Sequence, residues 1–370
     1  MAGERVAGAI QSGRLRELLR RMIDIYSPSG KEEELLEMLG THLERQGLAV
    51  RRQPVDDKRY NILVLPDEGE AQLALVGHLD TVTAPDLENL GCSEDGGVLR
   101  GLGAADMKGG CAAAVEALLA LRVERPGLPL ALALVVGEEE EGDGAEALVE
   151  ELHFPWAVVG EPTDLQPCSA HYGYMECELV TRGPRRHASL ADNVRNPIRV
   201  MLRTLLQITD HLDDQPELIY NIRDLDSYPR GFVVPERCEA WIDLHLPPRA
   251  PMGLISRGIE EVVERAQQAV ADVELDLRFA GIYSGYELAP SEPVVAALER
   301  IYSRRDWPWR PGAFRSHSDA NTLWAAGIKP VLLGCGRLAE AHVPDEWVAF
   351  EQVERAAGVY RALALELFED

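Results

Sequence analysis

Four consecutive glutamates, Glu138 to Glu141, follow an apolar run in the stretch LALVVGEEEEGDGAEAL, residues 132–148. Carboxylates crowded beside a buried strand raise one another's pKa, whereas bound divalent cations hold them ionised. We therefore interpret Glu138 as a general base, Glu139 as a metal ligand, and Glu140 and Glu141 as solvated residues. The residues alone leave two alternatives open, a register shifted by one position and an acidic loop that only faces water.

A histidine and an aspartate close a second apolar run, LVGHLDTV, as His78 and Asp80. In an extended segment such alternate residues point to the same side. Asp80 can therefore orient the imidazole of His78 while the other ring nitrogen binds a cation. A surface turn with a capping aspartate is the alternative.

Asp106 stands in a glycine-rich turn, GLGAADMKGG, directly before a helical pattern. The turn does not match a dinucleotide-binding fingerprint, because Asp106 occupies the position of the third glycine. A carboxylate in such a turn can offer one oxygen to each of two cations, or it can simply begin the helix.

Glu161 and His342 complete a set of donors near strand ends, since Glu161 follows the apolar run WAVVG and His342 comes after VLLGCG. In open α/β sheets functional groups gather beyond the carboxyl ends of the strands. Five nitrogen and oxygen donors suffice for two divalent metals that share a bridging carboxylate and activate a water. These donors are His78, Asp106, Glu139, Glu161 and His342.

The composition limits the class of protein. With 370 residues, 46% of them hydrophobic and 27% charged, the chain is long enough for two globular domains. A formal net charge of -25 repels phosphate backbones, so nucleic acid is not an expected partner. The apolar runs are too short to cross a membrane and no secretion signal is visible, so we expect a cytoplasmic protein without membrane contact. The six cysteines form no CxxC pair, which argues against a zinc ribbon.

Alternating helical and extended patterns frame these donors and indicate an α/β core. Helices are expected at 12–26, 31–46 and 109–123, and strands within 59–66, 71–78 and 128–137. After residue 286 the alternation returns, with helices at 292–304 and 319–326, a strand at 329–336 and a last helix from Phe350.

The middle of the chain has a different order of elements. Strands at 175–181, 232–234, 236–246 and 273–279 and helices at 197–211 and 252–270 give the order β-α-β-β-α-β of a ferredoxin-like module. We therefore expect a catalytic domain formed by residues 1–170 and 286–370, with a separate domain inserted at 171–285.

Five ordered motifs, GHLDTV, GLGAADMKGG, GEEEEGDGA, GEPTD and AHVPDE, resemble those of one di-zinc hydrolase family. That family includes acetylornithine deacetylase, succinyl-diaminopimelate desuccinylase, aminoacylase, glutamate carboxypeptidase and tripeptide aminopeptidase. The resemblance covers essentially the whole chain. It implies a mixed-sheet α/β zinc-hydrolase domain with an inserted ferredoxin-like α+β lid, through which two copies form a homodimer.

The resemblance also implies how the metals are held. One zinc would be bound by His78 and Glu161 and the other by Glu139 and His342, with Asp106 as the bridge. Cobalt and manganese are alternatives to zinc. The peptide bond after Asp106 would be cis.

Further roles follow from the same resemblance. Asp80 would orient His78, and Glu138 would take a proton from the bridging water and return it to the leaving amine. His187, in RGPRRHASL, would reach the active site of the partner subunit and stabilise the oxyanion. An exposed loop histidine is the alternative for His187.

Three residues mark departures from the family pattern and are candidates for substrate binding. Asn196 precedes Pro197 where relatives have an asparagine-alanine pair, and Arg315 and His317 stand in RSHSDAN where many relatives have a glycine-rich loop. Arg315 could clamp a substrate carboxylate or form a structural ion pair.

The function that these features favour is the hydrolysis of the amide bond of a small N-acyl amino acid or a short peptide. A carboxypeptidase or a di- or tripeptide aminopeptidase of the same family is the alternative. A binding protein that has lost catalysis is less supported, because no ligand or base is missing from the motifs.

Overall fold

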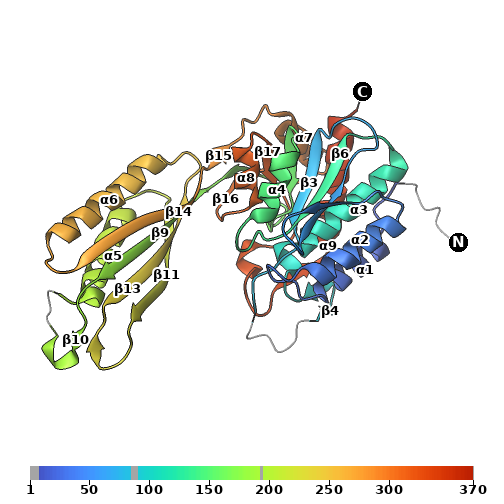
Figure 1. The fold of residues 1–370 in the computed structure, drawn as a ribbon. Coiled ribbons are helices and arrows are strands. Elements are labelled where there is room, and N and C mark those ends of the chain that lie inside the picture. The colour runs from blue at the N-terminus through green and yellow to red at the C-terminus, as the bar shows by residue number, and fades with distance from the viewer. Residues whose placement is uncertain (1–7, 85–90, 192–194, 370) are drawn as a thin grey trace. The chain divides into compact units, whose positions relative to one another are not determined.

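The computed structural model describes residues 8–84, 91–191 and 195–369, which form two compact units (Figure 1). The first unit comprises Met1–Ala170, Leu288–Phe314 and Ser318–Asp370, and the second comprises His171–Glu287 and Arg315–His317. The tripeptide 315–317, which the sequence pattern placed with the catalytic domain, thus groups with the second unit.

A mixed sheet forms the centre of the first unit, which confirms the predicted α/β class. Its strands are β1 (Arg51–Pro54), β2 (Tyr60–Val64), β3 (Leu73–His78), β6 (Leu130–Val135), β7 (Trp156–Val159), β8 (Cys168–His171), β16 (Gly312–Phe314) and β17 (Lys329–Leu332). They run in the order β1-β2-β6-β3-β7-β17-β8, with β16 paired to β8. The four strands β6, β3, β7 and β17 are mutually parallel, whereas β2 pairs antiparallel with β6 and β1 pairs antiparallel with β2.

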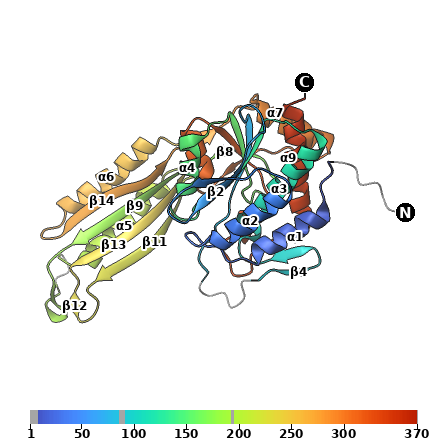
Figure 2. The same cartoon turned by 45° about the vertical axis from the view of Figure 1, so that its right-hand side comes forward.

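Helices surround this sheet, some packed on the strands and others on the helices that cover them. They are α1 (Ser12–Ile23), α2 (Glu33–Arg45), α3 (Gly109–Glu124), α4 (Asp143–Glu151), α7 (Pro293–Arg304), α8 (Asp319–Ala325) and α9 (Phe350–Leu367). The helix α3 is buried from Gly109 to Leu121 and packs against α1 and α9, since its alanines and glycines allow close approach (Figure 2). The strands β4 (Ser93–Asp95), β5 (Val98–Arg100) and β18 (Trp347–Ala349) form a small separate sheet. The turn Ala104–Lys108 follows β5 in the chain.

The second unit has the predicted β-α-β-β-α-β order. Its elements are β9 (Gly173–Arg182), α5 (Pro197–Asp213), β11 (Ile219–Tyr228), β13 (Arg237–Leu246), α6 (Met252–Gln268) and β14 (Glu274–Tyr283), followed by β15 (Tyr286–Glu287). The antiparallel sheet runs β11-β13-β9-β14, and α5 and α6 pack together on it (Figures 1 and 2). Side chains such as Met201, Ile208, Ile242 and Ile259 form its core.

One predicted strand of this unit was wrong. Residues 232–234 do not join the four-stranded sheet, because β12 (Val233–Val234) pairs instead with β10 (Arg186–His187). The missing strand is β11, which the sequence analysis left unassigned. Most of its side chains are exposed, so its sequence IYNIRDLDSY lacks the apolar alternation by which strands are recognised.

Among the described residues, no helix is both long and apolar enough to cross a membrane.

Candidate metal centre

Three neighbouring parallel strands bring part of the predicted set of donors to one edge of the sheet. The strand β3 ends at His78, which is in register with Val135, the last residue of β6. Glu138 and Glu139 follow β6 after Gly137, and Glu161 follows the end of β7. Because the carboxyl ends of parallel strands share an edge, side chains distant in sequence converge there.

Asp106 lies between the two predicted histidine ligands. Its Oδ1 is 3.2 Å from Nε2 of His78, and its Oδ2 is 3.6 Å from Nε2 of His342. The carboxylate thus offers a different oxygen to each imidazole, which is the arrangement that a bridging ligand needs. The peptide bond between Asp106 and Met107 is cis, as the family resemblance implied.

The remaining carboxylates complete two overlapping groups. Around His78, Oε2 of Glu138 lies 3.9 Å and Oε1 of Glu161 lies 4.0 Å from Nε2. Nε2 of His342 lies 3.1 Å from Glu139. Ligand atoms within 4.8 Å of one another are offered by three sets: His78, Asp106 and Glu161; His78, Glu138 and Glu139; Asp106, Glu139 and His342.

The charges at this edge fit divalent cations. Oε1 of Glu161 is buried and has no hydrogen-bond partner among the described residues, although a buried charge without a partner is costly. Burial and neighbouring acids raise the pKa of Glu161 well above its usual range, and burial does the same to the pKa of Glu138. Hard oxygen donors and neutral imidazoles are suitable zinc ligands, so the donor set fits a pair of metal ions.

The histidines reflect the same excess of acid. A hydrogen bond with Glu139 raises the pKa of His342 to about 9. Burial lowers the pKa of His78, but its contacts with Asp106 and Asp80 outweigh burial and hold that pKa well above its usual value. Both imidazoles therefore act as counterions to the carboxylates in the absence of a cation.

Asp80 does more than the sequence indicated. Nδ1 of His78 lies 3.0 Å from the backbone oxygen of Asp80 and 3.6 Å from its Oδ1. The carboxylate of Asp80 also accepts hydrogen bonds from the backbone N–H groups of Glu138 at 3.2 Å and Glu139 at 3.0 Å, and from Oγ of Ser29 at 2.6 Å. One buried aspartate therefore fixes both a predicted ligand and the turn that carries the predicted base.

Two acidic residues of this region were given no role by the sequence analysis. Asp319, at the start of α8, is buried and interacts electrostatically with Glu138 and Glu161, and burial raises its pKa to about 7. Glu346 is buried beneath the turn of Asp106 and accepts a hydrogen bond from the backbone of that residue. Glu346 lies inside the motif AHVPDE, which was the available signal.

The other predicted site residues belong to the second unit. His187 is an exposed residue of β10 whose Nδ1 lies 2.8 Å from Oγ of Ser189. Asn196 caps α5, since its Oδ1 accepts from the backbone N–H of Ile198 at 3.0 Å. Their roles with substrate stay predictions.

Arg315 and His317 lie in the short segment Arg315–His317, which belongs to the second unit although it is distant from the rest of that unit in sequence. Arg315 is exposed, whereas burial lowers the pKa of His317 to about 4. The ring of His317 lies 4.5 Å from that of Tyr283 and 5.2 Å from that of Tyr174. His317 is thus a packed, neutral imidazole, and its predicted substrate contact is untested.

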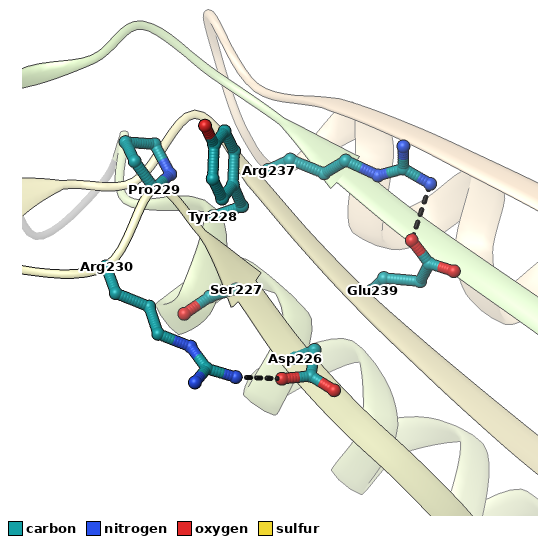
Figure 3. A pocket seen from close by; sticks show the side chains of 7 residues that line it. All are labelled: Asp226, Ser227, Tyr228, Pro229, Arg230, Arg237 and Glu239. Atoms are coloured by element: carbon teal, nitrogen blue, oxygen red, sulfur yellow. Dashed lines mark hydrogen bonds and ion pairs between the residues drawn. The ribbon is translucent and has the colours of Figure 1, made fainter.

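A hollow at the β11–β13 end of the second unit offers no comparable chemistry (Figure 3). It is lined by Asp226, Ser227, Tyr228, Pro229, Arg230, Arg237 and Glu239. Each of its arginines is paired with one of its acids, Arg230 with Asp226 and Arg237 with Glu239, as Figure 3 shows. Its charges are therefore already compensated within the protein.

Comparisons with known proteins give matches in sequence and in fold. The model of peptidase family M20/M25/M40 matches residues 74–366. An acetylornithine deacetylase of Proteus mirabilis is 27% identical over 370 aligned positions, which cover 91% of this chain and 92% of the relative. A tripeptidase from Staphylococcus aureus has a similar fold, with a TM-score of 0.82, 18% identity and coverage of 97% of this chain and 100% of its own. The YXEP protein of Bacillus subtilis, described as a dinuclear metal-binding peptidase, has a TM-score of 0.72, 14% identity, and coverage of 96% and 97%.

Proposed function

The chain belongs to peptidase family M20/M25/M40 and is a hydrolase of amide bonds, and on this premise we propose that two zinc ions and Glu138 cleave a small N-acyl amino acid. One observation supports the proposal above the others. One carboxylate oxygen of Asp106 faces His78 and the other faces His342. The buried carboxylates around them outnumber the positively charged groups nearby.

The following residues would hold the two metals. His78 and Glu161 would hold one metal, Glu139 and His342 the other, and Asp106 both. When bound, such a pair supplies Lewis acidity, which lowers the pKa of a water and polarises the scissile carbonyl.

Glu138 would move the proton. Its carboxylate lies 3.9 Å from His78 at the end of β6, and burial raises its pKa, which makes it a stronger base. It would accept a proton from the attacking water as the new C–O bond forms. The same proton would pass to the nitrogen as the C–N bond breaks, so that a free amine and a carboxylic acid leave.

Two neighbouring glutamates provide the test of this role. Glu138→Gln should lower kcat by about 10²–10⁴-fold while the protein still binds two metal equivalents. Glu140→Gln, an exposed position of the same acidic run, should retain activity within about two-fold. Turnover by metal-loaded Glu138→Gln at the wild-type rate would exclude Glu138 as the base.

The substrate class is proposed on the curated relatives. The acetylornithine deacetylase matches nearly the whole chain, which favours an N-acyl amino acid over a peptide. A di- or tripeptidase is the second candidate, because the similar folds include a tripeptidase. Metal-loaded protein, prepared with zinc, cobalt or manganese, should release acetate or succinate from acylated amino acids. If the protein releases amino acids from peptides but does not hydrolyse acylated amino acids, the result would support the second candidate.

We further propose a homodimer formed through the second unit. Its edge strand β11 exposes Ile222 and Leu225, and its helix α5 exposes Leu206, which is 65% accessible. An open edge strand is a template for pairing with a second copy. Leu206→Glu should shift the mass measured by light scattering from dimer to monomer, whereas Leu254→Glu, on α6 and 69% accessible, should not. Equal masses for both variants and the wild type would count against this interface.

A further inference from the structure

The turn that presents Asp106 is held by one buried carboxylate, that of Glu346. Oε1 of Glu346 accepts hydrogen bonds from the backbone N–H groups of Ala105 at 2.8 Å and Asp106 at 2.9 Å. Oε2 accepts from the backbone N–H of Gly103 at 2.7 Å. Glu346 is only 2% exposed, so these bonds are formed away from water.

The turn needs these acceptors because its own backbone does not supply them. Asp106 and Met107 have non-helical dihedral angles, which interrupts the regular ladder at the start of the helical segment. Buried N–H groups require a partner, and hydrogen bonds to a carboxylate are stronger than those between neutral groups. Two of the three donors belong to Asp106 and the residue before it, so the bonds act directly on the backbone that aims the Asp106 side chain.

The segment that carries Glu346 is itself fixed to the start of the same turn. The backbone oxygen of Glu346 accepts from Gly101 at 3.0 Å, and Trp347 pairs with Arg100 between β18 and β5. His342 precedes Glu346 by only four positions. The short segment 342–346 therefore contains His342, a proposed ligand of one metal. It also contains Glu346, which holds the backbone of Asp106, the residue proposed to bridge both metals.

We propose that Glu346 is a positioning residue that centres Asp106 between His78 and His342 and so makes the two metal ions bind as a pair. The proposal rests on the proposed two-metal function. Its physical reason is the narrow tolerance of metal bonds, since ligand distances must stay within about 0.2 Å of their ideal values. A bridging carboxylate that shifts toward one histidine serves one ion and loses the other.

Glu346→Gln tests this role with little change in volume. A glutamine has one carbonyl oxygen, and its NH₂ group would meet an N–H donor, so at least one of the three bonds is lost. Asp345→Asn is the matched control, because Asp345 is the exposed neighbour and the change removes the same charge.

The readout is metal binding to the metal-free protein, measured by isothermal titration with Zn²⁺. The wild type and Asp345→Asn should bind two equivalents, whereas Glu346→Gln should bind the second about 10–100-fold more weakly. With two equivalents of Mn²⁺, the wild type should show the electron paramagnetic resonance signal of a coupled pair. Glu346→Gln at the same loading should show isolated ions.

The outcomes separate this inference from the proposed function. A wild type that binds no metal would overturn the two-metal function itself. Two equivalents bound equally tightly by the wild type and Glu346→Gln would overturn the role of Glu346 alone. If Glu346→Gln does not fold, as judged by circular dichroism, Glu346→Asp serves instead. It keeps the charge but is one methylene shorter, and it must show the same weakening of the second equivalent for the proposal to stand.

Discussion

Replacing Gly110 by alanine tests whether close packing behind the sheet edge sets the position of Glu161. Gly110 lies in α3, where an added Cβ would stand 2.2 Å from the carbonyl oxygen of Gly160 and 3.0 Å from its carbonyl carbon. An ordinary contact of a Cβ begins near 3.4 Å, so either the helix or the end of β7 must move by about 1 Å. Gly160 directly precedes Glu161, so the displacement reaches a proposed metal ligand.

The magnitude of the effect follows from this displacement. Overpacking of a buried contact costs about 1–3 kcal/mol of unfolding free energy. A misplacement of about 1 Å in a catalytic site costs about 10²-fold in rate. We therefore expect Gly110→Ala to lose about 100-fold in kcat/KM and to bind one of its two metal equivalents more weakly.

The control is Gly13→Ala, the same change in helix α1. No atom lies within 4 Å of a Cβ built on Gly13, and Gly13 lies in the first turn of α1, so the alanine should stabilise the helix by less than the about 0.5–1 kcal/mol of a helix interior and leave kcat/KM unchanged. Urea unfolding of the metal-free proteins, Zn²⁺ titration and steady-state kinetics give the three readouts. A Gly110→Ala variant with wild-type stability, metal affinity and kcat/KM would refute the reasoning from packing.

Three further predictions concern the charges of the site. Asp80→Asn should weaken metal binding by about 10–100-fold in a Zn²⁺ titration, because an amide cannot accept from both backbone N–H groups of the glutamate turn and also pair with His78. In the metal-free protein, Asp319→Asn should gain thermal stability relative to the wild type as the pH rises from about 4 to 8. Burial raises the pKa of Asp319 to about 7, so the folded wild type binds this proton more tightly than the unfolded state and loses that stabilisation as the carboxyl group ionises; a difference in melting temperature that does not grow over this range would contradict the assignment. Glu161→Gln should raise the stability of the metal-free protein at pH 8 by on the order of 1–2 kcal/mol in urea unfolding, yet lower its affinity for Zn²⁺, since it removes a buried acid whose charge the imidazole of His78 offsets only in part.

The positions of His78 and the glutamates after β6 were predictable because fully buried strands are recognisable as short, continuous apolar runs. Every residue of Leu73–His78 and Leu130–Val135 is buried, and each run ends where polar residues begin. The carboxyl ends of such strands meet at one edge, so His78 and the glutamates after β6 had to be neighbours. The residues alone left the register within the glutamate run uncertain by one position, and the family resemblance supported Glu138 as the base.

Other features depended on contacts that no local pattern carries. Glu346 follows no buried strand, and its bond to the backbone of Asp106 joins positions 240 residues apart. Asp319 begins a short helix, where an aspartate is ordinarily an N-terminal residue facing water. The strand β11 escaped prediction for the opposite reason, because an edge strand that buries little has no apolar periodicity to find.

The excess of negative charge is the feature that separates this site from the other acidic parts of the chain. Surface acids are paired or exposed, as Asp226 is with Arg230, and their charges cost the fold little. At the sheet edge, buried carboxylates face two imidazoles, and burial together with the neighbouring acids Glu161, Asp319 and Glu139 raises the pKa of Glu138 well above its usual range. Apolar residues in such positions would generally make a protein more stable. Divalent cations would supply the missing charge, which is the physical reason to propose metal binding at this edge and to leave exposed Glu140 to solvent.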